Sequence, residues 1–326
     1  MKKIFITGGG GYVGSALVPQ LLEAGNEVTV LDLFIYGSEV LDTHPNLRIV
    51  EGDIRNQDLV KSLLPGQTDV IHLACISNDP SFELNPNLGK SINLDPFEPL
   101  VVNSKAAGIS RFIYASSSSV YGIKEESDVH EEMSLEPLTD YSRFKAECEV
   151  ILNSHVSSSF TGVTIRPATV CGYARRQRLD VVVNILTNQA YHSRKVAVLG
   201  GSQLRPNIHI SDMVRSYFFL LDAAPELVNG QIFNAGDENK SVMELAKIVQ
   251  EEVGLDVAIE VKPSTDNRSY HISSEKIRRV LGFSTVHSIR EAVRDLRSAL
   301  EDGRLPNSLT DDKYFNIKKM QKIGLE

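Results

Sequence analysis

The stretch Thr7-Gly8-Gly9-Gly10-Gly11-Tyr12-Val13-Gly14-Ser15 decides the fold. It follows an apolar run, Lys3–Thr7, and leads into an amphipathic pattern, Val13–Glu23, so it predicts a strand, a turn and a helix. Gly8, Gly11 and Gly14 have the spacing G-x-x-G-x-x-G, which allows a tight turn, close backbone approach to a phosphate, and helix packing on the strand. Because a helix N-terminus offers free N–H groups to anions, the stretch predicts a dinucleotide diphosphate site.

An acid, Asp32, ends the next apolar run, Glu27–Asp32. Its carboxylate is placed to accept hydrogen bonds from the adenosine ribose hydroxyls and to repel a 2′-phosphate. No Arg or Lys lies between Asp32 and Arg48 to hold such a phosphate. The sequence therefore favours NAD over NADP as the cofactor.

Short β-branched runs alternate with helical patterns through the first half of the chain. This alternation predicts an α/β fold with a Rossmann-type, doubly wound parallel sheet. Strands are expected at Lys3–Thr7, Glu27–Asp32, Leu47–Glu51, Val70–Leu73, Arg111–Ala115 and Phe160–Arg166, and helices at Val13–Glu23, Gln57–Leu63, Leu88–Ala107 and Ser142–Ser154.

The pattern loosens after Arg166, which indicates a second, smaller domain. We expect residues 1–167 to form the cofactor domain, with 206–236 rejoining it. Residues 168–205 and 237–326 are then a discontinuous C-terminal substrate domain, in which the polar tail after Pro306 is peripheral. The expected elements are helix Leu179–Ala190, strand Val196–Leu199, β-like runs Pro206–Ile210 and Gln231–Asn234 around helix Ser211–Leu221, and helices Ser241–Val253, Ser274–Leu281 and Ser288–Leu300.

Composition argues against several classes of protein. The chain has 326 residues, 42% hydrophobic and 23% charged, which is typical of a globular enzyme. With 34 Lys and Arg against 42 Asp and Glu, the net charge of -8 disfavours a nucleic-acid partner. No apolar stretch approaches about 18 residues, so we expect no membrane partner and a cytoplasmic location. Three scattered cysteines, Cys75, Cys148 and Cys171, predict neither a disulfide framework nor a metal site.

A set of further motifs resembles the extended short-chain dehydrogenases/reductases, and within them the NAD-dependent nucleotide-sugar epimerases and dehydratases. The resemblance covers nearly the whole chain, with the motifs in the family's order. After the glycine motif come Asp53-Ile54, His72-Leu73-Ala74, Ser116-Ser117-Ser118-Ser119-Val120-Tyr121-Gly122, Tyr141-Ser142-Arg143-Phe144-Lys145 and Arg166-Pro167-Ala168-Thr169. The stretch Arg178-Leu179-Asp180-Val181-Val182-Val183-Asn184 is similar to relatives that act on nucleotide-linked hexoses and heptoses.

The resemblance implies that Ser117, Tyr141 and Lys145 are catalytic. The residues agree: Tyr141 and Lys145 are four apart at the start of a helix, and a nearby ammonium favours a phenolate. The ordinary tyrosine pKa of about 10 has to fall before Tyr141 can act as a base near neutrality. Ser117 would hydrogen-bond the reacting oxygen. Cofactor contacts are implied for Gly8, Gly11, Tyr12, Val13, Gly14, Asp32, Asp53, Ile54, Leu73, Ala74, Tyr141, Lys145 and Arg166.

On the substrate side, the resemblance implies contacts from Ser117, Ser118, Asn184, Arg205 and Arg268. Two guanidinium groups, on Arg205 and Arg268, suit a nucleotide diphosphate in charge and in geometry. The arginines at 175, 176 and 178 are compatible both with added positive potential at the site and with a solvated loop.

Departures from relatives narrow the reaction. Ser118 and Ser119 stand where the 4,6-dehydratases carry an acid pair, and no cysteine lies between Cys75 and Cys148, where 3,5-epimerase and reductase relatives use one. The leading hypothesis is therefore an NAD-dependent epimerase that transiently oxidises one sugar carbon, which in relatives is most often C4. The alternative is a net NAD-dependent oxidoreductase acting on a nucleotide-linked hexose or heptose.

Two other hypotheses about the function have less support. A non-catalytic, cofactor-sensing protein is disfavoured because Ser117, Tyr141 and Lys145 are all present. Dehydrogenases of steroids or flavonoids share the fold, but diphosphate-type arginines do not suit an apolar ligand. Relatives pair through the helices that correspond to Leu88–Ala107 and Ser142–Ser154, so the resemblance also implies a homodimer.

Overall fold

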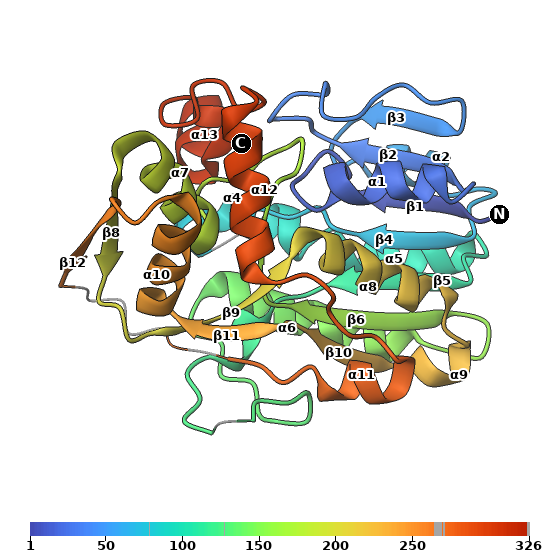
Figure 1. Cartoon of the computed structure of the whole chain (residues 1–326). Coiled ribbons are helices and arrows are strands. Elements are labelled where there is room, and N and C mark those ends of the chain that lie inside the picture. Colours follow the sequence, from blue (N-terminus) through green and yellow to red (C-terminus); the bar gives the residue numbers. More distant parts are fainter. Residues whose placement is uncertain (78, 127, 264–268, 270, 325–326) are drawn as a thin grey trace.

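A parallel seven-stranded sheet runs through the protein in the order β10-β6-β5-β4-β1-β2-β3 (Figure 1). The structure is a computed structural model that describes residues 1–77, 79–126, 128–263, 269 and 271–324. The strand order reverses beside β1, as the Rossmann-type prediction requires, and that prediction is confirmed. The strands are β1 (Lys3–Thr7), β2 (Glu27–Asp32), β3 (Leu47–Glu51), β4 (Asp69–His72), β5 (Arg111–Ala115), β6 (Thr161–Pro167) and β10 (Gln231–Ala235).

Helices cover both faces of this sheet because alternate side chains of each strand point to opposite sides. Ile4 and Ile6 of β1 pack on one face and Phe5 on the other, and all three are fully buried. One face is covered by α1 (Gly14–Glu23), α8 (Ile210–Asp222) and α11 (Glu275–Leu281), and the other by α2 (Gln57–Leu63), α4 (Pro86–Asn93), α5 (Phe97–Ala106) and α6 (Asp140–His155).

The remaining residues form two smaller sheets and a helical cluster. One sheet has the order β11-β9-β7, and the other pairs β12 with β8. Val183, Leu245 and Val293 are fully buried where three of the helices meet. The elements are β7 (Thr169–Cys171), α7 (Val182–Ser193), β8 (Lys195–Leu199), β9 (Leu204–His209), β11 (Glu238–Ser241), α10 (Val242–Val253), β12 (Ala258–Lys262) and α12 (Ile289–Glu301). The short helix α9 (Pro225–Val228) lies instead against β6 and β10 of the main sheet.

Of the two runs expected to rejoin the main sheet, β10 does so beside β6. The run Pro206–Ile210 does not, and that prediction is wrong. It forms β9, which pairs in parallel with β7 and antiparallel with β11. The physical reason is that β10 already occupies the free edge of β6, whereas β7 offers β9 an edge of its own.

Two predicted helices differ from the structure. The single helix expected over Leu88–Ala107 is two helices, α4 and α5, with a break before Pro96. Proline has no N–H to donate and disfavours a helical residue before it. The helix expected from Leu179 begins at Val182. Leu179 instead donates its N–H to the carbonyl oxygen of Tyr314, 2.9 Å away.

The tail after Pro306 is not peripheral, contrary to expectation. Its elements are η2 (Asp312–Tyr314) and α13 (Asn316–Ile323), which contacts α3 (Asp79–Glu83) of the sheet domain. Tyr314 and Asn316 are both only 3% exposed. Met320 packs against the core cluster of the sheet. No local pattern indicated this, because Tyr314 and Asn316 have their buried partners in segments far away along the chain.

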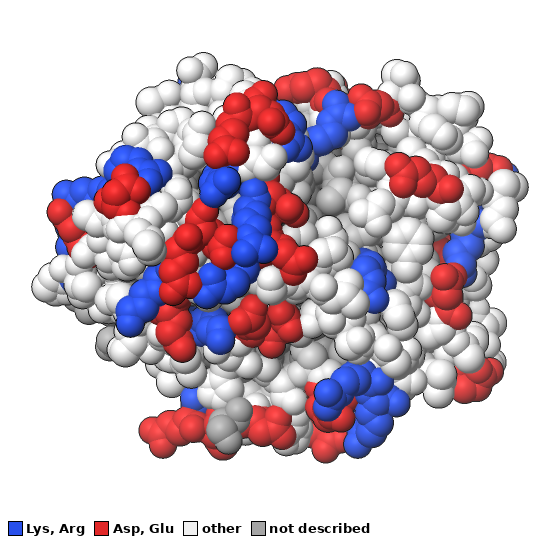
Figure 2. All heavy atoms as spheres, in the orientation of Figure 1, with Lys and Arg blue, Asp and Glu red and all other residues white. Residues whose placement is uncertain are grey.

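Charges of both signs are interspersed over α12 on the face in Figure 2. Arg290 pairs with Glu251 and Glu252, and Arg294 also pairs with Glu252. No helix in the described part of the chain is long and apolar enough to cross a membrane.

Candidate active site

The glycine loop lies at the carboxyl end of β1, beside the point where the strand order reverses. Gly8 has φ of 78°, and a Cβ there would lie 2.5 Å from the backbone nitrogen of Ala74. A Cβ at Gly14 would lie 2.5 Å from the carbonyl oxygen of Gly9. Both glycines are therefore required. Gly8 is required by its backbone conformation and by the close approach of the segment after β4, and Gly14 by the close packing of α1 on the glycine loop.

Asp32 lies beside this loop and helps to shape it. Its carboxylate accepts hydrogen bonds from the N–H groups of Gly10 and Phe34, each at 2.8 Å. Burial raises the pKa of Asp32 above its usual value. The carboxylate also lines the cavity and has further lone pairs with which to accept from hydroxyl groups.

The serine run follows β5 and ends in η1 (Ser118–Tyr121). Ser116 donates a hydrogen bond from its hydroxyl to the buried carboxylate of Glu149, so this hydroxyl is already paired inside the protein. Ser117 has an extended backbone, and its Oγ lies 2.9 Å from that of Ser119. The strand end thus presents Ser117, Ser118 and Ser119 to the cavity.

Tyr141 and Lys145 occupy the first turns of α6. Thr139 caps this helix by accepting a hydrogen bond from the N–H of Ser142 at 3.2 Å. Lys145 is 5% exposed, and its Nζ lies 5.8 Å from the centre of the Tyr141 ring. An ammonium at this distance in a buried site favours the phenolate form of a tyrosine. The geometry therefore suits Tyr141 to exchange a proton with a bound hydroxyl group.

His72 is buried nearby but is not a second base. Its Nδ1 lies 2.7 Å from the hydroxyl oxygen of Thr7, which ties β4 to β1. Burial lowers the pKa of His72 to about 3, so the imidazole is neutral at physiological pH.

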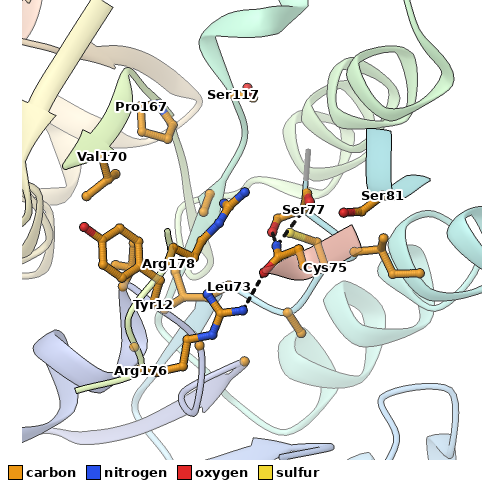
Figure 3. A pocket seen from close by; sticks show the side chains of 18 of the residues that line it. Tyr12, Leu73, Cys75, Ser77, Ser81, Ser117, Pro167, Val170, Arg176 and Arg178 are labelled. Atoms are coloured by element: carbon orange, nitrogen blue, oxygen red, sulfur yellow. Dashed lines mark hydrogen bonds between the residues drawn. The ribbon is translucent and has the colours of Figure 1, made fainter. Parts of the chain in front are cut away.

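One cavity joins the glycine loop, Asp32, the serines and the Tyr141–Lys145 pair (Figure 3). It brings together most of the residues predicted from the sequence. Those lining it are Gly8, Gly11, Tyr12, Val13, Gly14, Asp32, Ile54, Leu73, Ala74, Ser117, Ser118, Tyr141 and Lys145.

Three predicted contact residues point elsewhere. The Asp53 carboxylate binds the guanidinium of Arg55, with Oδ2 2.7 Å from Nη2, and does not line the cavity. Arg166 is 2% exposed and pairs with Glu149 at 2.6 Å inside the core. Asn184 is fully buried behind Tyr12, whose hydroxyl oxygen accepts its amide hydrogen bond at 3.0 Å. The motifs place these three residues near the site, but their side chains form ion pairs or hydrogen bonds with other groups of the protein.

Arg205, one of the two predicted diphosphate arginines, does not line this cavity. Arg205 lies on β9 and donates to the carbonyl oxygen of Leu204 at 2.9 Å. Arg268 falls outside the described residues.

Among the cavity residues that were not predicted as contacts are Tyr36, Ser77, Arg176 and Asn316. Arg176 and Arg178 both line the cavity, whereas Arg175 is exposed and binds Asp42. In the sequence, the cluster of arginines at 175, 176 and 178 pointed to this part of the site. It did not show which of these side chains would be buried and which would be exposed to solvent. Asn316 had no local signal, because its partners lie far away in the sequence.

The cavity fits a dinucleotide. The glycines leave the backbone of the loop open where a Cβ would fill the space, and Asp32 supplies a hydroxyl acceptor at the end of β2. The N-terminal turn of α1 offers its N–H groups to a diphosphate.

Comparison with known proteins agrees with this geometry. Residues 4–236 match the model of the "NAD dependent epimerase/dehydratase family". The chain belongs to this family. It is therefore an NAD-dependent, nucleotide-sugar-modifying enzyme, as the motif resemblance implied.

Relatives within the family differ in their reactions. The chain is 27% identical to a UDP-glucose 4-epimerase of Corynebacterium glutamicum, over 97% of this chain and 99% of the relative. It is 28% identical to a dTDP-glucose 4,6-dehydratase of Streptomyces niveus, over 86% and 88% of the two chains. The structure of MoeE5 in complex with UDP-glucuronic acid and NAD superposes with a TM-score of 0.82 at 25% identity, covering 92% and 99% of the two chains.

Proposed function

We propose that this enzyme is a nucleotide-sugar epimerase that inverts one sugar carbon, C4, through a transient ketone. The observation that carries the proposal is the joint placement of Ser117, Tyr141 and Lys145 in the cavity of the glycine loop, with Ser118 and Ser119 directly after Ser117. This arrangement supplies one proton-transfer group and no acid pair.

The three catalytic residues have separate roles in this proposal. Tyr141 takes the proton of the sugar hydroxyl and later returns a proton to the ketone oxygen. Lys145 stabilises the phenolate of Tyr141, and Ser117 donates a hydrogen bond to the reacting oxygen. When bound, NAD supplies the hydride chemistry, accepting a hydride from the carbon and giving it back to the opposite face.

The Ser118–Ser119 pair argues against a dehydratase. Removing water from a sugar requires an acid and a base besides the hydride transfer. Ser118 is 3% exposed, and the hydroxyl of Ser119 is paired with that of Ser117. Neutral hydroxyl groups of this kind do not exchange protons as carboxyl groups do near neutral pH.

The test uses a UDP-hexose or dTDP-hexose deuterated at C4. An epimerase returns the same hydride, so the label stays at C4 of the epimer and no NADH accumulates. Label found in free NADH would instead establish the net oxidoreductase. A product lighter by one water would overturn the proposal, since only a dehydratase forms it.

We also propose that two copies of the chain pair through α5 and α6. These helices pack against each other in the monomer, and their outer faces leave Val102 44% and Val150 71% exposed. An exposed valine on each of two adjacent helices supports a shared helical interface between two copies.

A further inference from the structure

The C-terminal helix α13 reaches back to the cofactor cavity through one buried side chain. Asn316 donates from Nδ2 to the hydroxyl oxygen of Ser77 at 2.9 Å, and its Oδ1 accepts a hydrogen bond from Arg176 (Figure 3, dashed lines). Its backbone N–H donates to the carboxylate of Asp180 at 2.8 Å. Asn316 therefore joins the chain after β4 to the loop between β7 and α7.

Arg176 is a buried cation with unused hydrogen-bonding capacity. It is 4% exposed, and its guanidinium lies 3.6 Å from the centre of the Tyr36 ring. Its Nε is buried and has no hydrogen-bond partner in the described structure. Burial lowers the pKa of Arg176 to about 10, so the group is still charged at neutral pH. A buried N–H of a charged group without a partner is costly. The residue that carries it, Arg176, lines the cofactor cavity.

The loop that carries Arg176 is fastened to the glycine loop at two points. The hydroxyl of Tyr12 donates to the carbonyl oxygen of Gly172 at 2.6 Å. The backbone N–H of Arg176 donates to the hydroxyl of Ser15, in the first turn of α1, at 3.1 Å. Arg176 thus begins at the helix turn to which the diphosphate of a dinucleotide binds, and its side chain extends into the same cavity.

We propose that Arg176 is a second anchor for the cofactor diphosphate, and that Asn316 of α13 latches it over the bound dinucleotide. The cation supplies charge-assisted hydrogen bonds in addition to those of the glycine loop. The Tyr36–Arg176–Asn316–Ser77 chain connects the segment after β2 to the segment after β4, and these strands flank β1 on either side. It therefore crosses the cavity in which NAD lies.

The latch makes cofactor exchange depend on α13. NAD enters or leaves only when the hydrogen bonds of Asn316 to Arg176 and Ser77 are broken. The cofactor therefore stays bound between turnovers. The proposal rests on the NAD site and not on which carbon of which sugar reacts.

The diphosphate anchor is tested with Arg176→Gln, and Arg175→Gln is the matched control because that neighbouring side chain is exposed and pairs with Asp42. Calorimetry on the full-length protein compares NAD, ADP-ribose and adenosine. We expect the Arg176 variant to bind NAD and ADP-ribose at least about 10-fold more weakly, with adenosine unchanged. Equal weakening for all three ligands, or for none, would overturn the anchor.

The latch is tested with Asn316→Ala, and Gln321→Ala, on the exposed side of the same helix, is its control. Exchange of bound NAD for labelled NAD gives the dissociation rate, and stopped-flow fluorescence of NADH gives the association rate. Both rates should rise about 10-fold in the Asn316 variant, because an open latch speeds entry as well as exit. Faster dissociation with unchanged association would mean a plain contact residue and would overturn the latch.

A second route avoids any change within α13. Ser77→Ala removes the other partner of Asn316 and should raise the same two rates, and the double variant should exceed the faster single variant by less than twofold, because one latch is opened by either change. Additive effects would contradict the single latch. No sugar is present in these measurements, so their outcome is independent of the label test for the epimerase reaction.

Discussion

Lys145 donates a hydrogen bond from its ammonium group to the carbonyl oxygen of Ala115, 2.7 Å away at the end of β5. The serine run starts at the next residue, so this bond fixes the ammonium between the tyrosine of α6 and the strand that presents Ser117. The ammonium is held in place by the backbone of the main sheet, and its position beside Tyr141 is set before any ligand binds.

Replacing Tyr141 by Phe should lower turnover by about 10²–10⁴-fold, because the group that accepts the hydroxyl proton is lost. NAD affinity should change little, since the ring is kept. Steady-state kinetics and calorimetry check both expectations. Tyr191→Phe, on α7, controls for loss of a phenol elsewhere. If the Tyr141 variant keeps more than a tenth of the parent activity, the assigned acid/base is wrong.

Asp32→Asn should weaken NAD binding about 10-fold and narrow the preference for NAD over NADP, because the ribose hydroxyls lose a charged acceptor. Calorimetry with both cofactors measures this. Tighter binding of NADP than of NAD by the parent would contradict the role of Asp32.

The same substitution should also change the pH dependence of stability. Burial raises the pKa of Asp32, so the folded cofactor-free protein binds that proton more tightly than the unfolded chain. The contribution of Asp32 to stability therefore falls as the pH rises above about 3.9, and its full cost is present near neutrality. Denaturation curves should show the Asn variant gaining stability relative to the parent between pH 4 and pH 7. A difference that is constant with pH would contradict the raised pKa.

Arg166→Met should destabilise the fold by about 3–5 kcal/mol, because the carboxylate of Glu149 is left buried without its cation. Urea denaturation measures the loss. Changing Glu149 to Leu as well should restore part of it. Arg143→Met, which breaks an exposed pair with Asp140, should cost no more than about 1 kcal/mol. The folded Arg166 variant should bind NAD normally. A selective loss of NAD affinity would show instead that Arg166 contacts the cofactor.

Arg205→Ala should weaken binding of UDP or dTDP about 10-fold and leave NAD affinity nearly intact, if this arginine holds the substrate diphosphate. Arg48→Ala, an exposed cation on β3, is the control. Unchanged affinity for both nucleoside diphosphates would place the substrate site elsewhere.

Val150→Glu should convert a dimer into a monomer, because it replaces an apolar side chain of the proposed α5–α6 interface by a charged one. Val261→Glu changes a similarly exposed valine on β12 and should leave the dimer intact. Sedimentation velocity separates the two states. A parent protein that is itself monomeric would refute the proposed pairing.

Local patterns in the sequence were enough to predict the parallel sheet and the centre of the site. The glycine spacing, Asp32 at a strand end, and the four-residue step from Tyr141 to Lys145 each depend on neighbours within one or two elements. Regular elements then bring these residues together, because the carboxyl ends of parallel strands meet at one edge of a sheet.

Contacts between distant residues could not be predicted in the same way. Asn316 and Ser77 are 239 positions apart, and nothing near either residue marks the other. Arg175 and Arg176 are chemically alike, yet one is exposed and the other buried, because the fastening of their loop to α1 turns only Arg176 inward. Arg166 sits in a family motif, but its role depends on the buried carboxylate of Glu149.

The late position of β10 in the chain matters for folding during translation. Its partner, β6, ends at Pro167, and β10 itself is not synthesised until Gln231–Ala235. During translation the main sheet therefore has an open edge at β6 while β7 to α9 are produced, and open strand edges invite pairing with other chains. A fragment cut at residue 167 would keep that edge permanently. We expect it to aggregate, although it contains the whole glycine loop and all three residues that we propose to be catalytic.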